Sequence, residues 1–287
     1  MAKLESYIVT TANQLGIGTL GFGGETSLLA CKIGAFHRLP ASFFVTVSYN
    51  CWAFRRVGVK LSADTGDIAD WLYKKEASVT AHSTATDAPA EKEENLVHLT
   101  TPITESQIRQ LKMGDIVSIS GRVYTGRDAI HHHLHHEGTC PVDLNGHIIY
   151  HCGPVIAQNE DGKYVVRAAG PTTSIREEPY QGDVMKKFGL RAVIGKGGMG
   201  QKTLAALKEH GGVYINAIGG AAQYYAERIQ AVEGVDFLDF GTPEAMWHLR
   251  VEDFRAVVTM DSHGNSLHAN VEKSSLERLA MHADKVF

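Results

Sequence analysis

The sequence predicts a layered α/β fold, with α+β as the alternative, and three observations lead to this class. In the second half of the chain, short apolar segments rich in β-branched residues alternate loosely with segments of helical spacing. The chain has 29 glycines, and clusters of them lie at 16–24, 195–200, 211–212 and 219–220, where tight turns would join such elements. The chain contains no internal repeat.

The elements of the N-terminal part are predicted in order as follows. Residues 1–15 form an amphipathic helix, and 16–24 form a glycine-rich loop that leads into an apolar segment. The stretch FFVTVSYNCWAFRR (43–56) forms a strand, and DTGDIADWLYKK (64–75) forms a helix capped by aspartate. Residues 77–95 are small, polar and aperiodic, which predicts a flexible linker and a domain boundary near residue 95.

Downstream of the linker the predicted elements are more regular. The first are a capped helix over 103–115, a strand pair over 115–126, strands within 147–158 and 163–171, and a helical segment over 172–188. A strand that enters a glycine turn follows over 191–200, and then a helix over 203–212, a strand over 213–220 and a helix over 221–232. A mixed set of elements over 235–261 completes this part.

Composition excludes several classes of protein. A chain of 287 residues suggests about two domains, and a net charge of −4 argues against nucleic acid or an anionic membrane as the main partner. No apolar stretch reaches about 18 residues, and the N-terminus shows no targeting pattern, so we expect a cytoplasmic protein. The four cysteines include no CxxC pair, and each is expected to be a buried thiol.

Three loops carry cations in positions that suit an anion. The stretch AAGPTTSIREEPY (168–180) places hydroxyls and Arg176 after a Gly-Pro turn, GKGGMG (195–200) places Lys196 in a glycine turn, and TGRDAI (125–130) places Arg127 after a strand. A local ion pair or a simple tight turn would explain each loop singly. Together, Arg127, Arg176 and Lys196 predict a site for a dicarboxylate.

The tract HHHLHHEG (131–138) allows ligand pairs at i and i+4 if it is helical. Because no second carboxylate-bearing motif stands near it, the preferred interpretation is a solvated polar helix end. No role is assigned to these five histidines.

Six blocks resemble, in order, the β subunit or C-terminal domain of the iron–sulfur hydro-lyases, the family of class I fumarate hydratase and L(+)-tartrate dehydratase. The blocks are VSISGRVYTGRDAIHHHL, IIYHCGPV, AAGPTTSIREEPY, RAVIGKGGMG, VYINAIGGAA and GTPEAMWHLRVEDFRAVVTMDSHGNSLH. Residues 13–56 resemble the end of the family's α subunit. The resemblance implies that 1–76 belong to a cluster-bearing domain as a short α/β segment, and that 96–287 form a swivelling β/β/α domain.

The resemblance also implies a site. Thr172 would be the catalytic base, with its pKa lowered by nearby cations, and Arg127, Arg176, Lys196 and His37 would bind the substrate. Cys51 would be one ligand of a 4Fe–4S cluster that acts as a Lewis acid on the substrate. Glu177 would disfavour a dianion unless its carboxylate points away.

The implied function is hydration or dehydration of a small dicarboxylate, fumarate to malate or tartrate to oxaloacetate. One cysteine cannot hold a cubane cluster, so an α subunit or N-terminal cluster domain is expected as a partner, within an oligomer. Two alternatives remain open: a non-catalytic fragment, and a small-carboxylate binding module without its own cluster. The choice between fumarate, tartrate and a methylated substrate is left open.

Overall fold

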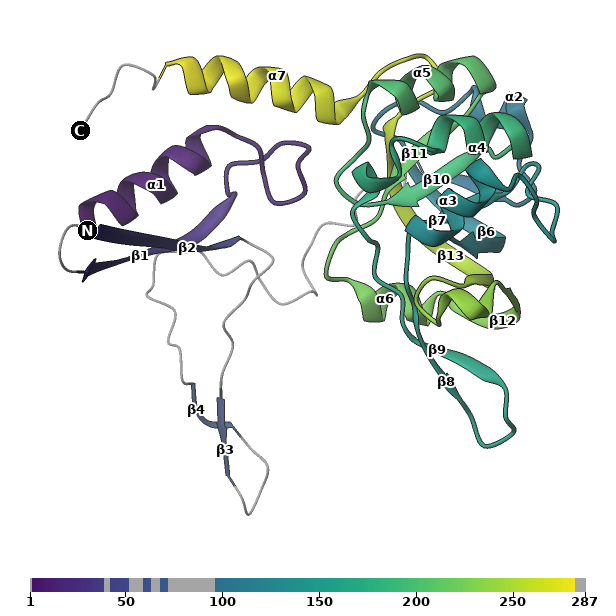
Figure 1. The fold of residues 1–287 in the computed structure, drawn as a ribbon, viewed down its shortest axis with the longest axis horizontal. Coiled ribbons are helices and arrows are strands. Elements are labelled where there is room, and N and C mark those ends of the chain that lie inside the picture. The colour runs from purple at the N-terminus through teal and green to yellow at the C-terminus, as the bar shows by residue number, and fades with distance from the viewer. Residues whose placement is uncertain (1, 39–41, 52–58, 63–67, 72–95, 282–287) are drawn as a thin grey trace.

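The computed structural model describes residues 2–38, 42–51, 59–62, 68–71 and 96–281. The linker expected over 77–95 lies outside the described residues. Within them, an N-terminal part built on a helix and two hairpins stands beside a larger sheet-based part, as Figure 1 shows.

The N-terminal part begins with helix α1 (Ala2–Gln14), as predicted, followed by strands β1 (Leu28–Arg38) and β2 (Ser42–Cys51) in an antiparallel hairpin. The side chain of Asn13 joins α1 to β1, because its Oδ1 accepts from the backbone of Ser27 at 2.7 Å and Leu28 at 2.8 Å. A second hairpin pairs β3 (Val59–Leu61) with β4 (Ile68–Trp71). The helix predicted over 64–75 is therefore wrong at 68–71, where cross-strand pairing overrides helical spacing.

The larger part is built on a seven-stranded sheet in the order β12-β13-β11-β10-β7-β6-β5. Its strands are β5 (Leu96–Thr100), β6 (Ile116–Thr125), β7 (Ile148–Tyr150), β10 (Ala192–Gly195), β11 (Val213–Asn216), β12 (Ile229–Asp236) and β13 (Met246–Met260). Strand β13 pairs antiparallel with both β11 and β6, so the sheet curls and the strands from β6 to β13 close into a ring.

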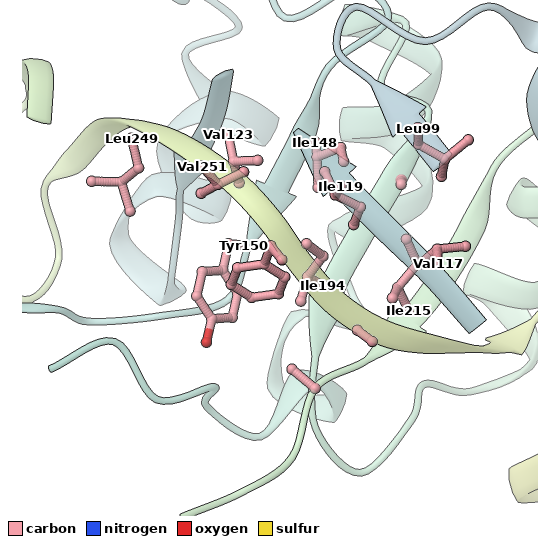
Figure 2. Close-up of a cluster of buried hydrophobic side chains, with 14 of the residues drawn as sticks. Leu99, Val117, Ile119, Val123, Ile148, Tyr150, Ile194, Ile215, Leu249 and Val251 are labelled. Carbon is pink, nitrogen blue, oxygen red and sulfur yellow. The ribbon is translucent and has the colours of Figure 1, made fainter. Parts of the chain in front are cut away.

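Alternating side chains of the short central strands supply two hydrophobic cores, one on each face of the sheet. Ile148, Tyr150 and Ile194 point into the core shown in Figure 2, which also takes in side chains of β8 (Val155–Gln158), β9 (Tyr164–Ala168) and α6 (Ala222–Glu227). Their neighbours Ile149 and Val193 point into the other core. That second core is covered by α3 (Asp128–His136), α4 (Gln181–Phe188) and α5 (Gln201–His210).

Several predicted elements differ in the structure. The strand pair expected over 115–126 is one continuous strand, β6, in which Gly121 has φ +105° and so takes a conformation that a side chain would strain. The helix expected over 172–188 divides into a 3-10 turn, η1 (Ser174–Glu177), and α4. The helix expected over 221–232 ends at Glu227, and the chain then enters β12.

The remaining elements are α2 (Glu105–Ile108), which begins with a capping box at Thr104, the 3-10 turn η2 (Leu238–Phe240) and α7 (Leu267–Ala280). Helix α7 reaches back to the N-terminal part, where Ser275 Oγ donates to the carbonyl of Leu15 at 3.0 Å. In the part of the chain that the structure describes, no helix has the length and apolarity to cross a membrane. The fold is mixed α/β with a core dominated by the sheet.

Candidate active site at the carboxyl edge of the parallel strands

Strands β6, β7, β10 and β11 run parallel to one another, so their carboxyl ends meet at one edge of the sheet. Arg127 follows β6 by two residues, His151 directly follows β7, and Lys196 directly follows β10. In sheets of this kind, ligands bind outside the carboxyl ends of the strands. This edge is therefore the place to look for a site.

The Thr172 segment crosses this edge and is fastened to two strand ends. Thr172 donates to the carbonyl of His151 through its backbone N at 2.7 Å and through Oγ1 at 3.1 Å. The backbone N of Lys196 donates to the carbonyl of Thr172 at 3.1 Å, and the backbone N of Ser174 donates to the carbonyl of Lys196 at 3.0 Å. Thr172 and Lys196, which lie far apart in the sequence motifs, are therefore neighbours in the backbone.

Glycines make the close approach of these loops possible. A Cβ on Gly195 would lie 1.8 Å from Ser174 Oγ, and a Cβ on Gly219 would lie 3.2 Å from Lys196 Cδ. The Lys196 side chain therefore passes over the loop that follows β11. Among the described residues, its ammonium has no acidic partner in an ion pair.

The two arginines lie together with acidic side chains. Arg127 stands at the N-cap position of α3 without a side-chain capping hydrogen bond, and it forms an ion pair with Glu244 (Nη1 to Oε1, 3.1 Å), while Arg176 forms an ion pair with Asp128. An open groove of about 640 Å³ lies beside them, lined by Asp128, Ala129, His132, Arg176, Tyr180 and Glu244. The four candidates thus form two pairs: Thr172 and Lys196 are joined through the backbone, and Arg127 and Arg176 are linked through Asp128, which follows Arg127 in the sequence and forms an ion pair with Arg176. Segment 172–176 joins Thr172 to Arg176, and no hydrogen bond or ion pair between described residues joins Lys196 to either arginine.

A buried polar network lies beneath the two pairs. The side chain of Gln181 bridges two imidazoles, with its Oε1 at 3.0 Å from His131 Nε2 and at 3.1 Å from His151 Nε2. His131 Nδ1 lies 3.0 Å from the carbonyl of Arg127, and His151 Nδ1 lies 2.9 Å from Ser174 Oγ. Both histidines are fully buried, and desolvation lowers the pKa of each.

The interpretation of the histidine tract as a solvated helix end is wrong for His131, which is 0% exposed. Helical spacing places His131 on the inner face of α3 with Ile130 and Leu134, both fully buried, while His132 and His136 are exposed. In the sequence, the apolar residues Ile130 and Leu134 at helical spacing beside His131 could have indicated that this histidine is buried. No comparable pattern in the sequence indicated the burial of His151.

The two glutamates after Arg176 do different things. Glu178 accepts hydrogen bonds at the start of α5 from the backbone N atoms of Gly200 (2.7 Å), Lys202 (2.9 Å) and Thr203 (3.2 Å), and so caps that helix. Glu177 is 1% exposed, and desolvation together with the neighbouring Asp128 raises its pKa to about 9.

The other two candidates lie in the N-terminal part. The backbone of His37 pairs with Phe43 in the β1–β2 hairpin, and that of Cys51 pairs with Leu28. The side chains of His37 and Cys51 lie outside the described residues.

The described cysteines do not form a metal site. Cys31 and Cys152 are buried free thiols, Cys140 is half-buried, and desolvation raises the pKa of Cys152 to about 12. A buried neutral thiol is a poor ligand, because metals bind the thiolate. Across the ranges that the structure describes, no three His, Cys, Asp or Glu side chains are grouped to hold a metal ion. The described residues therefore do not fit a 4Fe–4S cluster on their own.

Comparison with known proteins assigns the family. The family model described as "Fumarase C-terminus" matches residues 66–271, and the one described as "Fumarate hydratase (Fumerase)" matches residues 1–60. The chain belongs to the class I fumarate hydratase family. The whole chain is similar to a protein of Geobacillus stearothermophilus named "Putative fumarate hydratase class I", at 65% identity over 291 residues, and spans 56% of that relative's length.

A second relative matches about two thirds of this chain and nearly all of its own length. The L(+)-tartrate dehydratase subunit beta of Escherichia coli (strain K12) is 35% identical over 182 residues, which is 63% of this chain and 90% of the relative. The predicted resemblance to both branches of the family is confirmed.

Proposed function

We propose that the chain is part of a hydro-lyase that adds or removes water on a small dicarboxylate, fumarate to malate or tartrate to oxaloacetate. The observation that carries the proposal is the backbone junction between Thr172 and Lys196 at the carboxyl edge of the parallel strands, with Arg176 joined to it by a short segment and Arg127 following β6 at the same edge. A hydroxyl beside a cation can move a proton, and guanidinium groups bind carboxylates.

Each residue has a role in this proposal. Arg176, which is 57% exposed, and Lys196 bind substrate carboxylates, and Arg127 supports the same anion from the start of α3. Thr172 is the proposed base: its alkoxide takes the proton from the substrate carbon and so becomes the hydroxyl, which in the structure donates to the carbonyl of His151. The adjacent Lys196 cation favours removal of a proton from such a hydroxyl. His37 is proposed as a further substrate contact.

The iron–sulfur cluster is proposed to need residues outside this chain, since its described side chains do not fit one. Cys51 is the proposed ligand from this chain. The α subunit implied by the name of the tartrate dehydratase relative, or the part of the Geobacillus relative that this chain does not span, is the proposed partner in an oligomer. We further propose that 1–76 belong to the cluster-bearing domain, that 77–95 link it, and that 96–287 swivel as a β/β/α domain.

One observation favours a second function, a small-carboxylate binding module. All three cations proposed to bind the anion belong to this chain. Its described residues, in contrast, include no group of three or more His, Cys, Asp or Glu side chains that could hold a metal ion. Such a module would bind malate or tartrate but would not turn them over with any partner.

Calorimetric titration of the chain with malate and with tartrate tests the shared part of both functions. Arg176→Ala is expected to weaken binding about 10- to 100-fold, since a hydrogen bond to a charged group contributes about 1.5–3 kcal/mol. Arg167→Ala, which removes an exposed arginine on β9, is the matched control and is expected to bind like wild type. Equal affinity in the two variants would remove Arg176 from the site. Turnover after reconstitution with the partner then separates the hydro-lyase from the module.

A further inference from the structure

Two carboxyl groups of the site lie beside each other. Asp128 begins α3, is 42% exposed at its side chain and pairs with Arg176, whereas Glu177 lies in η1 and is 1% exposed. Their carboxyl groups are near enough to interact directly. Two ionised carboxylates at such a distance repel each other and neither can donate a hydrogen bond, so a proton on one of them stabilises the pair.

The surroundings of Glu177 show which of the two holds that proton. The titratable and charged groups that face it are Asp128 and His131 from α3, Arg176 from η1 itself, and Glu244 from the segment before β13. The only cation among these, Arg176, is paired with Asp128. His131 Nδ1 lies 3.7 Å from Glu177 Oε2, but that nitrogen already bonds the carbonyl of Arg127.

Glu177 Oε2 itself is buried and has no hydrogen-bond partner among the described residues. An ionised carboxylate buried in this way would lack both a counter-charge and donors, which is costly. The pKa values agree with the geometry. Desolvation and Asp128 raise the pKa of Glu177 to about 9, while the pKa of Asp128 is lowered, because the bond from Glu177 and the charge of Arg176 outweigh its desolvation.

We propose that Glu177 is a positioning residue that stays protonated at neutral pH and donates its hydrogen to Asp128, so that Asp128 holds Arg176 for a substrate carboxylate. The proposal rests on the proposed dicarboxylate function for its consequence, but the protonation of Glu177 can be tested without it.

The consequence concerns the charge of the site. With Glu177 neutral, the positive charges of Arg127 and Arg176 are balanced by Asp128 and Glu244, and Lys196 then leaves the edge attractive to an anion. An ionised Glu177 would add one negative charge close to the groove. Near a protein surface, such a charge about 12 Å away weakens anion binding about tenfold, and a closer one weakens it more. A neutral Glu177 explains why a glutamate can directly follow Arg176, the arginine proposed to bind the substrate.

Infrared spectroscopy of the chain tests the protonation directly. At pH 7 the wild-type chain is expected to show a protonated carboxyl C=O band that Glu177→Gln lacks and that Glu160→Gln, which changes an exposed residue near the β8–β9 turn, retains. In the wild type the band is expected to vanish as pH rises through about 9, a titration that needs no variant. A wild-type spectrum without the band at pH 7, or a band that survives in Glu177→Gln, would overturn the proposal.

Malate binding measured from pH 7 to pH 10 tests the consequence. Wild type is expected to lose about tenfold more affinity over this range than Glu177→Gln, because the variant keeps a neutral donor at every pH. Comparing the two removes the contribution of Lys196, which is the same in both. Parallel pH profiles would show that Glu177 does not set the charge of the site. Failure of the wild type to bind malate at any pH would count against the proposed function, while the infrared band still decides the state of Glu177.

Discussion

Replacing Gln181 by leucine tests whether the buried network organises the site. Gln181 is 0% exposed and is the side chain that bridges His131 and His151. Leucine is similar in size but leaves two buried ring nitrogens without their partner. Each unpartnered group costs about 1–3 kcal/mol, or about 2–6 kcal/mol for both, and burying the leucine returns about 1–2 kcal/mol. We therefore expect Gln181→Leu to lower the free energy of unfolding by about 3 kcal/mol.

Urea denaturation of the chain, followed by circular dichroism, measures this loss. Gln201→Leu, at the exposed start of α5, is the matched control and is expected to change the midpoint little. Because Gln181 and His131 share a bond, the double variant Gln181→Leu with His131→Leu should lose less than the sum of the single losses. A loss below about 1 kcal/mol for Gln181→Leu, or strict additivity in the double variant, would refute the reasoning.

Three further predictions concern single positions. Glu178→Ala should lower the free energy of unfolding by about 1–2 kcal/mol relative to Glu160→Ala, because it removes the acceptor that caps α5; equal midpoints would contradict this. Gly195→Ala should cost about 1–3 kcal/mol, since its Cβ would overlap Ser174 Oγ; an unchanged thermal midpoint would show that the junction gives way easily. Glu177 binds its proton more tightly in the folded chain, so its contribution is fully present below about pH 4.5 and is lost as pH rises through about 9. Wild-type stability should therefore fall by up to about 1.4 kcal/mol per pH unit between these values relative to Glu177→Gln, and parallel stability–pH curves would contradict the raised pKa.

The sequence predicted those parts of the fold in which local pattern and tertiary context agree. The strand that runs into the GKGG turn and the helix over 203–212 are both present, because a buried strand, a glycine turn and an amphipathic helix each have a local signature. The helix predicted over 64–75 failed at 68–71, where Ile68 and Trp71 belong to a hairpin that only pairing with β3 specifies. The strand pair expected over 115–126 is the single strand β6, because β13 pairs along nearly the whole of that strand.

The candidate site also has one part that the sequence predicted and one part that it did not. Thr172, Arg127, Arg176 and Lys196 could be chosen from loop chemistry and from resemblance, and the parallel strand order explains how distant loops reach one edge. The state of Glu177 and the role of Gln181 could not be predicted, because they depend on which side chains meet beneath the sheet edge, and no periodic signal encodes that meeting.

Turnover by the reconstituted enzyme tests the central claim most directly. The chain would be combined anaerobically with iron, sulfide and the part of the Geobacillus relative that it does not span, and fumarate hydration would be followed by absorbance, with tartrate dehydration followed by oxaloacetate formation. We predict activity only in the complete mixture, and a loss of about 100-fold or more in Thr172→Val with malate binding retained. Full activity in Thr172→Val would contradict the assigned proton transfer, and no activity from the wild-type mixture would contradict the hydro-lyase itself.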